Sequence, residues 1–407
     1  MLFGNDTATV PEHEATDPRK SLPQERDKGA VMTEKITIRD IARLAGVSKS
    51  TVSRVLNQKQ DVDTATRERI LRIVEEQAFV PSSAASGLAG GRSRMIGTLI
   101  PSLTWPLIPE ILRGVAEVVA QSPYELLLYS ITHDKDRTEK DQRDIIDRIL
   151  TSKLAGGLLA VFPGQSTQHL TRLHEQGFPV VIIDDQNEPT STPWVSADDR
   201  VGAYSAVRYL IHLGHRCIGY IQGPLNHQCT RDRYQGYCDA LSEAGLTPDP
   251  SLVLQGDFMF QGGRACASQF FALAKRPTAI FASNDAMAHG VLAAAEEYGL
   301  LVPEDISLVG FDDIPLSAHT RPALTTVRQP FYEMGQRATE WLLSLLESPR
   351  PLPDGPYTGP VQLGTSPFPS KQSEPIRIQL GTSLVVRASC GSPRHLSTST
   401  SEASSSV

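Results

Sequence analysis

From residue 95 onward, short apolar runs alternate with segments in which apolar residues recur every three or four positions. The short runs are typical of buried strands, and the periodic segments are typical of amphipathic helices. Strands are predicted at 95–101, 124–131, 155–162, 179–184, 217–223, 252–258, 277–285 and 306–313. Helices are predicted at 108–121, 141–152, 166–177, 198–214, 231–245, 262–274 and 286–299. Repeated strand–helix units form parallel sheets flanked by helices, so the two runs predict two Rossmann-like lobes.

Ligands of such folds bind at the carboxyl ends of the strands. The cleft between the two lobes is therefore the expected ligand site.

Residues 37–79 contain three shorter helical patterns. Gly46 and Val47 predict a tight turn after the first helix, and Ser48 is a favourable N-cap for the second. Asp63 is the predicted cap of the third helix. The residues expected to face the core of this small domain are Ile38, Ile41, Ala42, Ala45, Val52, Val55, Leu56, Ile70, Leu71, Ile73 and Val74.

The second of these helices is basic and free of acidic residues on its outward side. Two short helices joined by a glycine-containing turn, the second polar and basic on one face, are typical of a helix-turn-helix that enters the major groove. Acidic side chains there would face phosphates, whereas Lys49 and Arg54 can reach guanine acceptors and Ser50 can bond a base edge. A merely solvated helix face is the alternative. The outward residues are Lys49, Ser50, Ser53, Arg54 and Asn57.

Composition and charge support a basic module on an acidic body. Residues 33–94 hold eleven Lys and Arg against seven Asp and Glu, a net charge of about +4, in a chain of 407 residues whose total is −7. A polyanionic partner is therefore expected for this segment alone. No apolar run is long enough to span a bilayer, and the first residues lack the pattern of a secretory signal, so we expect a cytoplasmic protein.

The five cysteines form no CxxC pair and no metal-like spacing, so reduced, mostly buried thiols are expected. His212 and His215 are three residues apart, and we interpret them as capping and packing residues. Neither a metal nor a cofactor is expected.

At this point several motifs are recognisable together. The stretches ITIRDIARLAGVSKSTVSRVLN, HLGHRCIGYIQGP, AIFASNDAMAHGVL and VPEDISLVGFDDIP resemble the lactose/galactose repressor family. The resemblance covers about residues 33–348 and 376–387. It implies a dimeric transcriptional regulator, an α/β protein with a small all-α helix-turn-helix head and two lobes like those of periplasmic sugar-binding proteins.

The domain boundaries expected from the pattern and the resemblance are as follows. They are a disordered tail at 1–32, the DNA-binding head at 33–80, a hinge at 81–94, the two-lobe domain at 95–390, a Pro/Gly-rich loop at 349–375 within it, and a disordered tail at 391–407. The first lobe is expected at about 95–194 and 324–348, and the second at about 195–323 and 376–390.

The resemblance also assigns roles to single residues of the head and hinge. Lys49, Ser50 and Arg54 match the positions that read bases, and Leu88 matches a hinge leucine that wedges into the minor groove. The positions that match phosphate contacts are Thr37, Thr51, Ser53, Asn57 and Thr66.

In the cleft, the resemblance identifies Arg233 as the effector-binding arginine and Phe258 as an aromatic that stacks on the ligand. Arginine and carboxylates suit a polyol because each can bond neighbouring hydroxyls in pairs. Trp105 is interpreted either as a second sugar platform or as a residue that packs against a helix, and Asp285 either as an effector contact or as a helix cap. The expected effector residues are Trp105, Asp185, Gln186, Arg233, Phe258, Asn284 and Asp312, with Asp184 and Asp285 beside them.

The predicted function is sequence-specific DNA binding, with repression controlled by a small effector, expected to be a mono- or oligosaccharide. The predicted partners are a pseudo-palindromic double-stranded operator and a second copy of the chain. A purine or phosphorylated effector remains an alternative. An enzyme is the other, but the chain lacks GxSxG, Walker, HExxH and GxGxxG motifs. A transport-type binding protein would need a signal sequence and no DNA-binding head.

Overall fold

The computed structural model describes residues 36–56, 59, 61–79, 93–130, 139–152, 154–184, 191–347 and 377–393. It contains a small unit up to Ser82 and a larger one from Ser83 onward. The expected N-terminal tail, nearly all of the hinge, and the 349–375 loop lie outside the described residues. No described helix is long and apolar enough to cross a membrane.

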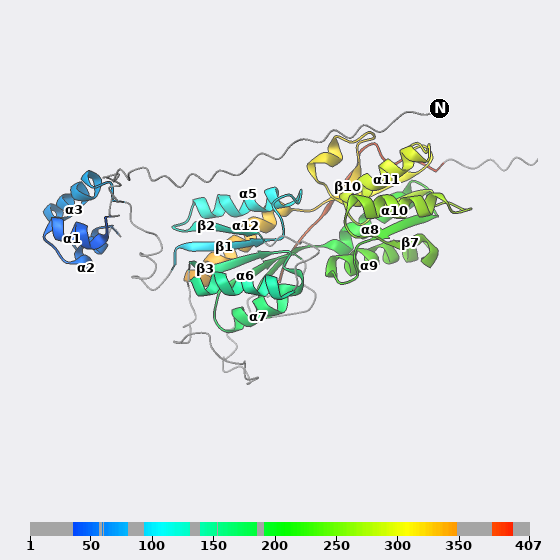
Figure 1. Cartoon of the computed structure of the whole chain (residues 1–407). Coiled ribbons are helices and arrows are strands. Elements are labelled where there is room, and N and C mark those ends of the chain that lie inside the picture. The colour runs from blue at the N-terminus through cyan, green and yellow to red at the C-terminus, as the bar shows by residue number, and fades with distance from the viewer. Residues whose placement is uncertain are drawn as a thin grey trace, which may run out of the picture. The chain divides into compact units, whose positions relative to one another are not determined.

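The small unit is a bundle of three helices: α1 (Ile38–Ala45), α2 (Lys49–Leu56) and α3 (Thr64–Glu76) (Figure 1). Asp40 accepts hydrogen bonds from the Thr37 N–H and hydroxyl at the start of α1. Gly46 ends α1 at φ +62°, a left-handed conformation that favours glycine. The core of the bundle consists of Ile41, Ala42, Ala45, Val52, Val55 and Ile70.

Leu71 departs from the prediction, because its side chain is 46% exposed. In α3 only Ile70 is fully buried, while Ile73 and Val74 are half-buried. The helix turns by about 100° per residue, so Leu71 leaves the face that Ile70 presents to the core.

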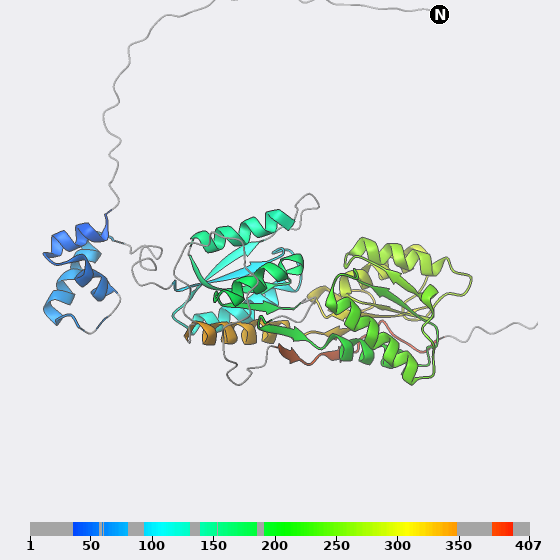
Figure 2. The same ribbon diagram turned by 90° about the horizontal axis from the view of Figure 1, so that it is seen from below.

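The first sheet of the larger unit has six parallel strands in the order β11-β5-β4-β3-β1-β2. Helices α5 (Ile108–Ala120) and α12 (Phe331–Glu347) cover one face, and α6 (Glu139–Ser152) and α7 (Thr167–Glu175) cover the other (Figures 1 and 2). The strands are β1 (Met95–Ile100), β2 (Glu125–Ser130), β3 (Ala155–Val161), β4 (Val180–Ile183), β5 (Trp194–Ala197) and β11 (Arg377–Leu380).

The second sheet has the order β12-β10-β9-β8-β6-β7, with only β12 antiparallel to its neighbour. Helices α10 (Phe260–Phe271) and α11 (Asp285–Glu297) cover one face, and α8 (Asp199–His212) and α9 (Gln228–Glu243) cover the other (Figure 1). The strands are β6 (Ile218–Gln222), β7 (Val253–Gln255), β8 (Ala279–Ala282), β9 (Ser307–Asp312), β10 (Thr325–Arg328) and β12 (Ser383–Val385).

In the part of the chain that the structure describes, three connections cross between the sheets: from β5 to α8, from β10 to α12, and from β11 to β12. Strand pairing therefore moves the expected lobe borders. Residues 195–197 and 377–380 lie in the first sheet rather than the second lobe, and 325–328 lie in the second sheet rather than the first lobe. These strands are at most four residues long, so they carry little periodicity, and distant pairing defines them.

The segment after β12 is also ordered by the second sheet, although a tail was expected from residue 391. The Gly391 N–H donates to Ser307 Oγ at 3.0 Å, and His215 Nε2 lies 2.9 Å from the Gly391 carbonyl oxygen. Buried His215 also contacts Thr278 Oγ1 at 2.9 Å. The described structure therefore extends past the predicted boundary at residue 391, because the segment after β12 supplies hydrogen-bond partners for buried polar groups.

Two glycines let α5 and α12 approach each other closely. A Cβ on Gly114 would lie 2.0 Å from the Tyr332 carbonyl oxygen, and one on Gly335 would lie 2.2 Å from the Ile111 carbonyl oxygen. Both clashes involve backbone, which cannot rotate away. The first lobe depends on this contact because α12 packs its apolar face on the sheet beside α5.

We predict that Gly114→Ala destabilises the larger unit. Alanine favours a helix by about 1 kcal/mol over glycine, but forcing the helices apart costs about 1–3 kcal/mol and more for a backbone clash. The melting temperature should fall by roughly 3–8 °C, measured by circular dichroism. Gly381→Ala is the control, because nothing lies within 4 Å of its added Cβ; equal melting temperatures for the two variants would contradict the close-packing argument.

Candidate DNA-reading surface and effector site

The outward side of α2 carries exposed Lys49, Ser50 and Arg54, opposite the buried Val52 and Val55. Arg54 forms an exposed ion pair with Asp61 at 3.3 Å, outside the helix. An exposed pair of this kind contributes little to stability and can be exchanged for another anion. The helix thus presents hydrogen-bond donors to solvent, and its own sequence contains no carboxylate.

Hydroxyl groups around the start of α2 bond one another. Ser48 Oγ lies 2.7 Å from Ser50 Oγ and 2.9 Å from Thr51 Oγ1, and it accepts from the Thr51 N–H at 3.2 Å. Ser48 is therefore the N-cap, as predicted. Ser53 is half-buried on the same helix. Asn57 and Leu88 lie outside the described residues.

Two further predicted phosphate contacts lie at helix starts. The Thr37 hydroxyl is bonded to Asp40 at the start of α1. The Thr66 N–H donates to Asp63 at 2.9 Å at the start of α3, and the bonds from Thr66 lower the pKa of the Asp63 carboxyl. These contacts hold the first turn of each helix.

In the larger unit, unusual backbone conformations gather at strand ends. Six described non-glycine residues have positive φ, and five of them end or follow a strand. Each such conformation costs about 1–3 kcal/mol and persists where surrounding structure enforces it, which is common at functional sites. The five are Phe162 after β3, Asp184 after β4, Phe258 after β7, and Asp312 and Asp313 at the end of β9.

Arg233 of α9 is the buried centre of the polar groups in the second lobe, with 3% exposure. Its Nε donates to Asp199 Oδ1 at 2.7 Å, and its Nη1 donates to the Ser283 carbonyl oxygen at 2.5 Å. Its Nη2 lies 3.8 Å from Asp312 Oδ1. The guanidinium also stacks over the Phe311 ring, 3.9 Å from its centroid.

Carboxylates keep this guanidinium charged. Burial alone lowers the pKa of Arg233, but Asp199, Asp312 and, from the first lobe, Asp184 raise the pKa above its ordinary value. The side chain predicted to bind the effector thus has its Nε and Nη1 groups engaged by the protein, which leaves Nη2 with the loosest contact.

Asp312 is also buried, with 7% exposure, and it accepts from Gln329 Nε2 at 2.7 Å. Burial raises the pKa of Asp312 to about 7, against the opposing effect of Arg233. The other amide atom, Gln329 Oε1, is buried without a hydrogen-bond partner.

Phe258 is held in place from three sides. Its ring lies against Gly223, where a Cβ would be 2.1 Å from the ring, and it meets the His227 ring edge-on at 5.6 Å. Asn284 Nδ2 donates to the Phe258 carbonyl oxygen at 3.0 Å, and Asn284 Oδ1 accepts from the Met287 N–H at 2.9 Å. Asn284 therefore caps α11 and fixes the Phe258 loop with both ends of its amide.

Trp105 is half-buried after β1 and packs at the edge of the first lobe's core. Its ring lies 6.0 Å from that of Phe162, tilted by 54°. The ring next to Trp105 is thus that of Phe162, which follows β3, and the choice between a sugar platform and a residue that packs against a helix stays a prediction. Asp185 and Gln186 lie outside the described residues.

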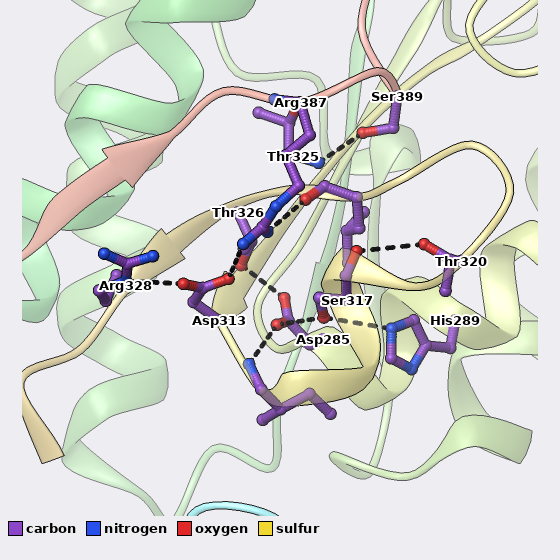
Figure 3. Close-up of polar contacts among 12 residues, drawn as sticks. Asp285, His289, Asp313, Ser317, Thr320, Thr325, Thr326, Arg328, Arg387 and Ser389 are labelled. Carbon is purple, nitrogen blue, oxygen red and sulfur yellow. Dashed lines mark hydrogen bonds and ion pairs between the residues drawn. The ribbon is translucent and has the colours of Figure 1, made fainter.

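Asp285 is bonded inside the protein (Figure 3), and Asn284 rather than Asp285 is the N-cap of α11. Asp285 is fully buried and accepts from Thr326 Oγ1 at 2.5 Å, Ser317 Oγ at 2.7 Å and the Ile314 N–H at 3.0 Å. The carboxylate therefore ties α11 to β10 and to η3 (Pro315–Ala318). Burial raises its pKa to about 7 despite these three donors.

Asp313 lies near Asp285 and its hydrogen-bond partners, and it joins two other segments (Figure 3). It pairs with Arg328 at 2.7 Å and with Arg387 at 2.6 Å. Arg387 also donates to the Leu324 carbonyl oxygen at 2.8 Å. The loop after β9 is thereby fixed to β10 and to the segment after β12.

Sequence reasoning did not identify Asp199, Gln329 or Phe162. Asp199 follows Asp198, which caps α8 by accepting from the Val201 N–H, and an Asp-Asp pair at a helix start signals capping rather than a buried ion pair. Its partner is 34 positions away. Within the described ranges no cluster of three or more His, Cys, Asp and Glu could hold a metal ion.

Comparison with known proteins matches both units. Residues 37–82 match the model of "Bacterial regulatory proteins, lacI family", and residues 207–390 match a periplasmic binding protein-like domain. The HTH-type transcriptional repressor CytR of Escherichia coli K12 is 34% identical over 313 residues, which are 76% of this chain and 90% of CytR.

The chain belongs to the lacI family of bacterial regulatory proteins. It is a DNA-binding transcriptional regulator with a small-molecule effector, and its relatives are repressors rather than enzymes. The lac repressor dimer bound to operator and the anti-inducer ONPF has a TM-score of 0.72 at 27% identity, covering 88% of this chain and 100% of that one. The regulator CelR in complex with cellobiose has a TM-score of 0.62 at 28% identity, with 87% and 99% covered.

We predict that the stability of the larger unit falls as pH rises from 5 to 8, and that Asp312→Asn reduces this slope. A carboxyl whose pKa is raised to about 7 binds a proton in the folded state that an unfolded carboxyl, with a pKa near 3.9, has already lost. The stabilising contribution is therefore complete below about pH 4 and is lost as pH rises through about 7.

The measurement is the melting temperature of wild type and variant at pH 5, 6, 7 and 8. The difference between the free energies of unfolding of wild type and variant, obtained from these melting curves, should change by about 1.4 kcal/mol per pH unit at most. Asp239→Asn is the control, because that partly exposed carboxyl has a lowered pKa and is ionised throughout. Parallel curves for wild type and Asp312→Asn would contradict the raised pKa.

Proposed function

We propose that this regulator reads its operator through α2 and is controlled by an uncharged sugar bound between its lobes. The observation that carries the DNA reading is the exposed, acid-free face of α2. Lys49, Ser50 and Arg54 are assigned to base edges, since lysine and arginine bond guanine acceptors and a serine hydroxyl adapts to several bases. Leu88 is assigned to the minor groove, and the phosphate contacts to Thr37, Thr51, Ser53, Asn57 and Thr66.

The sugar assignment is supported by the polar groups that surround Arg233. Three carboxylates, those of Asp184, Asp199 and Asp312, act on a single guanidinium whose Nε and Nη1 are already bonded. Such a site offers mainly acceptors, so its ligand should supply donors, as hydroxyl groups do. Trp105 and Phe258 provide aromatic rings for the apolar face of a sugar. The further contacts are assigned to Asp185, Gln186 and Asn284.

A phosphorylated effector fits less well, because its charge would face an excess of buried carboxylates. An uncharged purine is the remaining alternative, since aromatic side chains also stack on bases. The cellobiose bound to the similar regulator CelR supports the sugar.

Regulation would follow from a population shift. Two copies of the chain would place two heads on a pseudo-palindromic operator, as the lac repressor dimer binds operator. Effector binding would favour one lobe angle and so change operator affinity, typically by 1–3 kcal/mol and reciprocally. Because its target is chromosomal DNA, the regulator would act in the cytoplasm and, on this proposal, has no catalytic role.

We predict that Arg54→Ala weakens operator binding by about 1–3 kcal/mol and relaxes specificity at one base position. Fluorescence anisotropy on an operator selected from a random pool, and on variants of that operator, measures both. Arg43→Ala is the control, because Arg43 is an exposed arginine of α1, so its loss should weaken all sequences equally. An equal loss on operator and random DNA for Arg54→Ala would remove its base-reading role.

We predict that at least one neutral sugar changes operator affinity tenfold or more, and that Arg233→Ala abolishes this response. The panel contains ribose, glucose, galactose, cellobiose, glucose 6-phosphate and adenosine, measured by anisotropy with wild type and variant. The variant must still bind operator, and its melting temperature must show that it folds. A response only to adenosine would assign the effector to the purine class, and a response only to glucose 6-phosphate would assign it to the phosphorylated class. An unchanged sugar response in Arg233→Ala would move the site away from Arg233.

A further inference from the structure

Four buried polar side chains form a continuous chain across the second lobe. Gln329 donates to Asp312 at 2.7 Å, Asp312 faces Arg233 at 3.8 Å, and Arg233 donates to Asp199 at 2.7 Å. All four residues are between 3% and 7% exposed. The chain therefore exchanges few contacts with water, and the loss of one member leaves another buried group unpaired.

The two ends of this chain lie at two different crossings between the lobes. Asp199 is the first residue of α8, directly after the crossing from β5. Gln329 follows β10 and precedes α12, in the crossing back to the first lobe. Asp199 and Gln329, 130 positions apart in the sequence, are thus connected through the side chains of Arg233 and Asp312.

The third crossing is attached to the first. The Asp198 N–H donates to the Leu380 carbonyl oxygen at 2.8 Å, and the Thr382 hydroxyl donates to the Asp198 carbonyl oxygen at 3.3 Å. A Cβ on Gly202 would lie 2.7 Å from Thr382 Oγ1, so the contact is close as well as bonded. A displacement of Asp199 therefore acts on two of the three crossings.

One contact in the chain is weaker than the others. The 3.8 Å between Arg233 and Asp312 exceeds the length of a hydrogen bond, whereas the two flanking contacts are short. Gln329 Oε1, on the amide that bonds Asp312, is a buried acceptor without a partner. The amide of Gln329 can thus accept a ligand donor at Oε1 while its Nε2 donates to Asp312.

We propose that this chain couples the effector site to the crossings, with Asp199 and Gln329 acting as positioning residues that need not touch the effector. The proposal rests on the proposed function in that the effector binds at Arg233 and Asp312. A ligand that enters between these two side chains shifts both ends of the chain together. Because Asp199 and Gln329 lie in two of the crossings between the lobes, their shift changes the angle between the lobes.

The test is hydrogen exchange followed by mass spectrometry on the full-length protein without any ligand. Asp199→Asn should raise the exchange rate of peptides covering 326–334, at the other crossing, by about fivefold. Gln329→Leu should likewise raise the rate for peptides covering 198–203. The cross effect distinguishes coupling from a merely local structural role, which would change exchange only around the substituted residue.

Two controls use a carboxylate and an amide that do not belong to this hydrogen-bonded chain and are less buried than its members. Asp239→Asn removes an ion pair between α8 and α9, Arg200 to Asp239 at 2.7 Å, which is partly exposed. Gln336→Leu removes an α12 amide that donates to the Tyr332 hydroxyl at 3.0 Å. Neither should change exchange at the opposite crossing.

Exchange changes confined to the substituted crossing in both variants overturn the proposal, and so does a cross effect of equal size in the controls. If Asp199→Asn fails to fold, Asp312→Asn takes its place and must raise exchange at both crossings at once. Because no effector is added, a negative sugar panel leaves this result unaffected, and a negative exchange result leaves the sugar panel unaffected.

Discussion

The buried guanidinium of Arg233 is the constraint on which the second lobe depends. A charge that is 3% exposed is tolerated only where partners replace its lost water. Asp199 comes from the start of α8, the Ser283 carbonyl from the end of β8, and Asp312 from the end of β9. These three elements must therefore meet at one point, which fixes where the helix starts and strand ends converge.

The same constraint explains why strain accumulates at this edge of the sheets. Asp312 has a φ of +111° and is held by Gln329, while Asp313 has a φ of +56° and is held by Arg328 and Arg387. The apolar layers beneath supply the free energy that maintains such conformations, because the sheet residues there are fully buried. A buried apolar layer below and a strained polar layer above suit a protein that binds a small molecule.

The long periodic elements of the two strand–helix runs could be predicted from sequence, because their own residues determine them, whereas the 17-residue helix α12 was not among the predicted helices. Helix α5 carries a nearly complete apolar face, and the N-caps Ser48 and Asp63 are local signals. Strands β5, β10, β11 and β12 could not be predicted, since partners far along the chain define them. The role of Asp285 was open for a related reason. The sequence SND shows a polar group at a strand end, but Ser317 and Thr326, which bond it, lie 32 and 41 positions away. Arg233 was predicted as a site residue by its motif, while its partner Asp199 was not.

The three crossings also determine the order in which the protein can be completed during synthesis. When the chain has reached residue 330, the second sheet lacks only β12, while the first sheet still lacks α12 over one face and β11 at its edge. Apolar residues such as Val181 and Ile183, buried by α12 and its neighbours in the finished protein, are then without their full cover. The lobe that is made first is thus finished last, so the ribosome-bound chain exposes an apolar sheet face and an open strand edge. Such surfaces are the ones that aggregate or recruit chaperones.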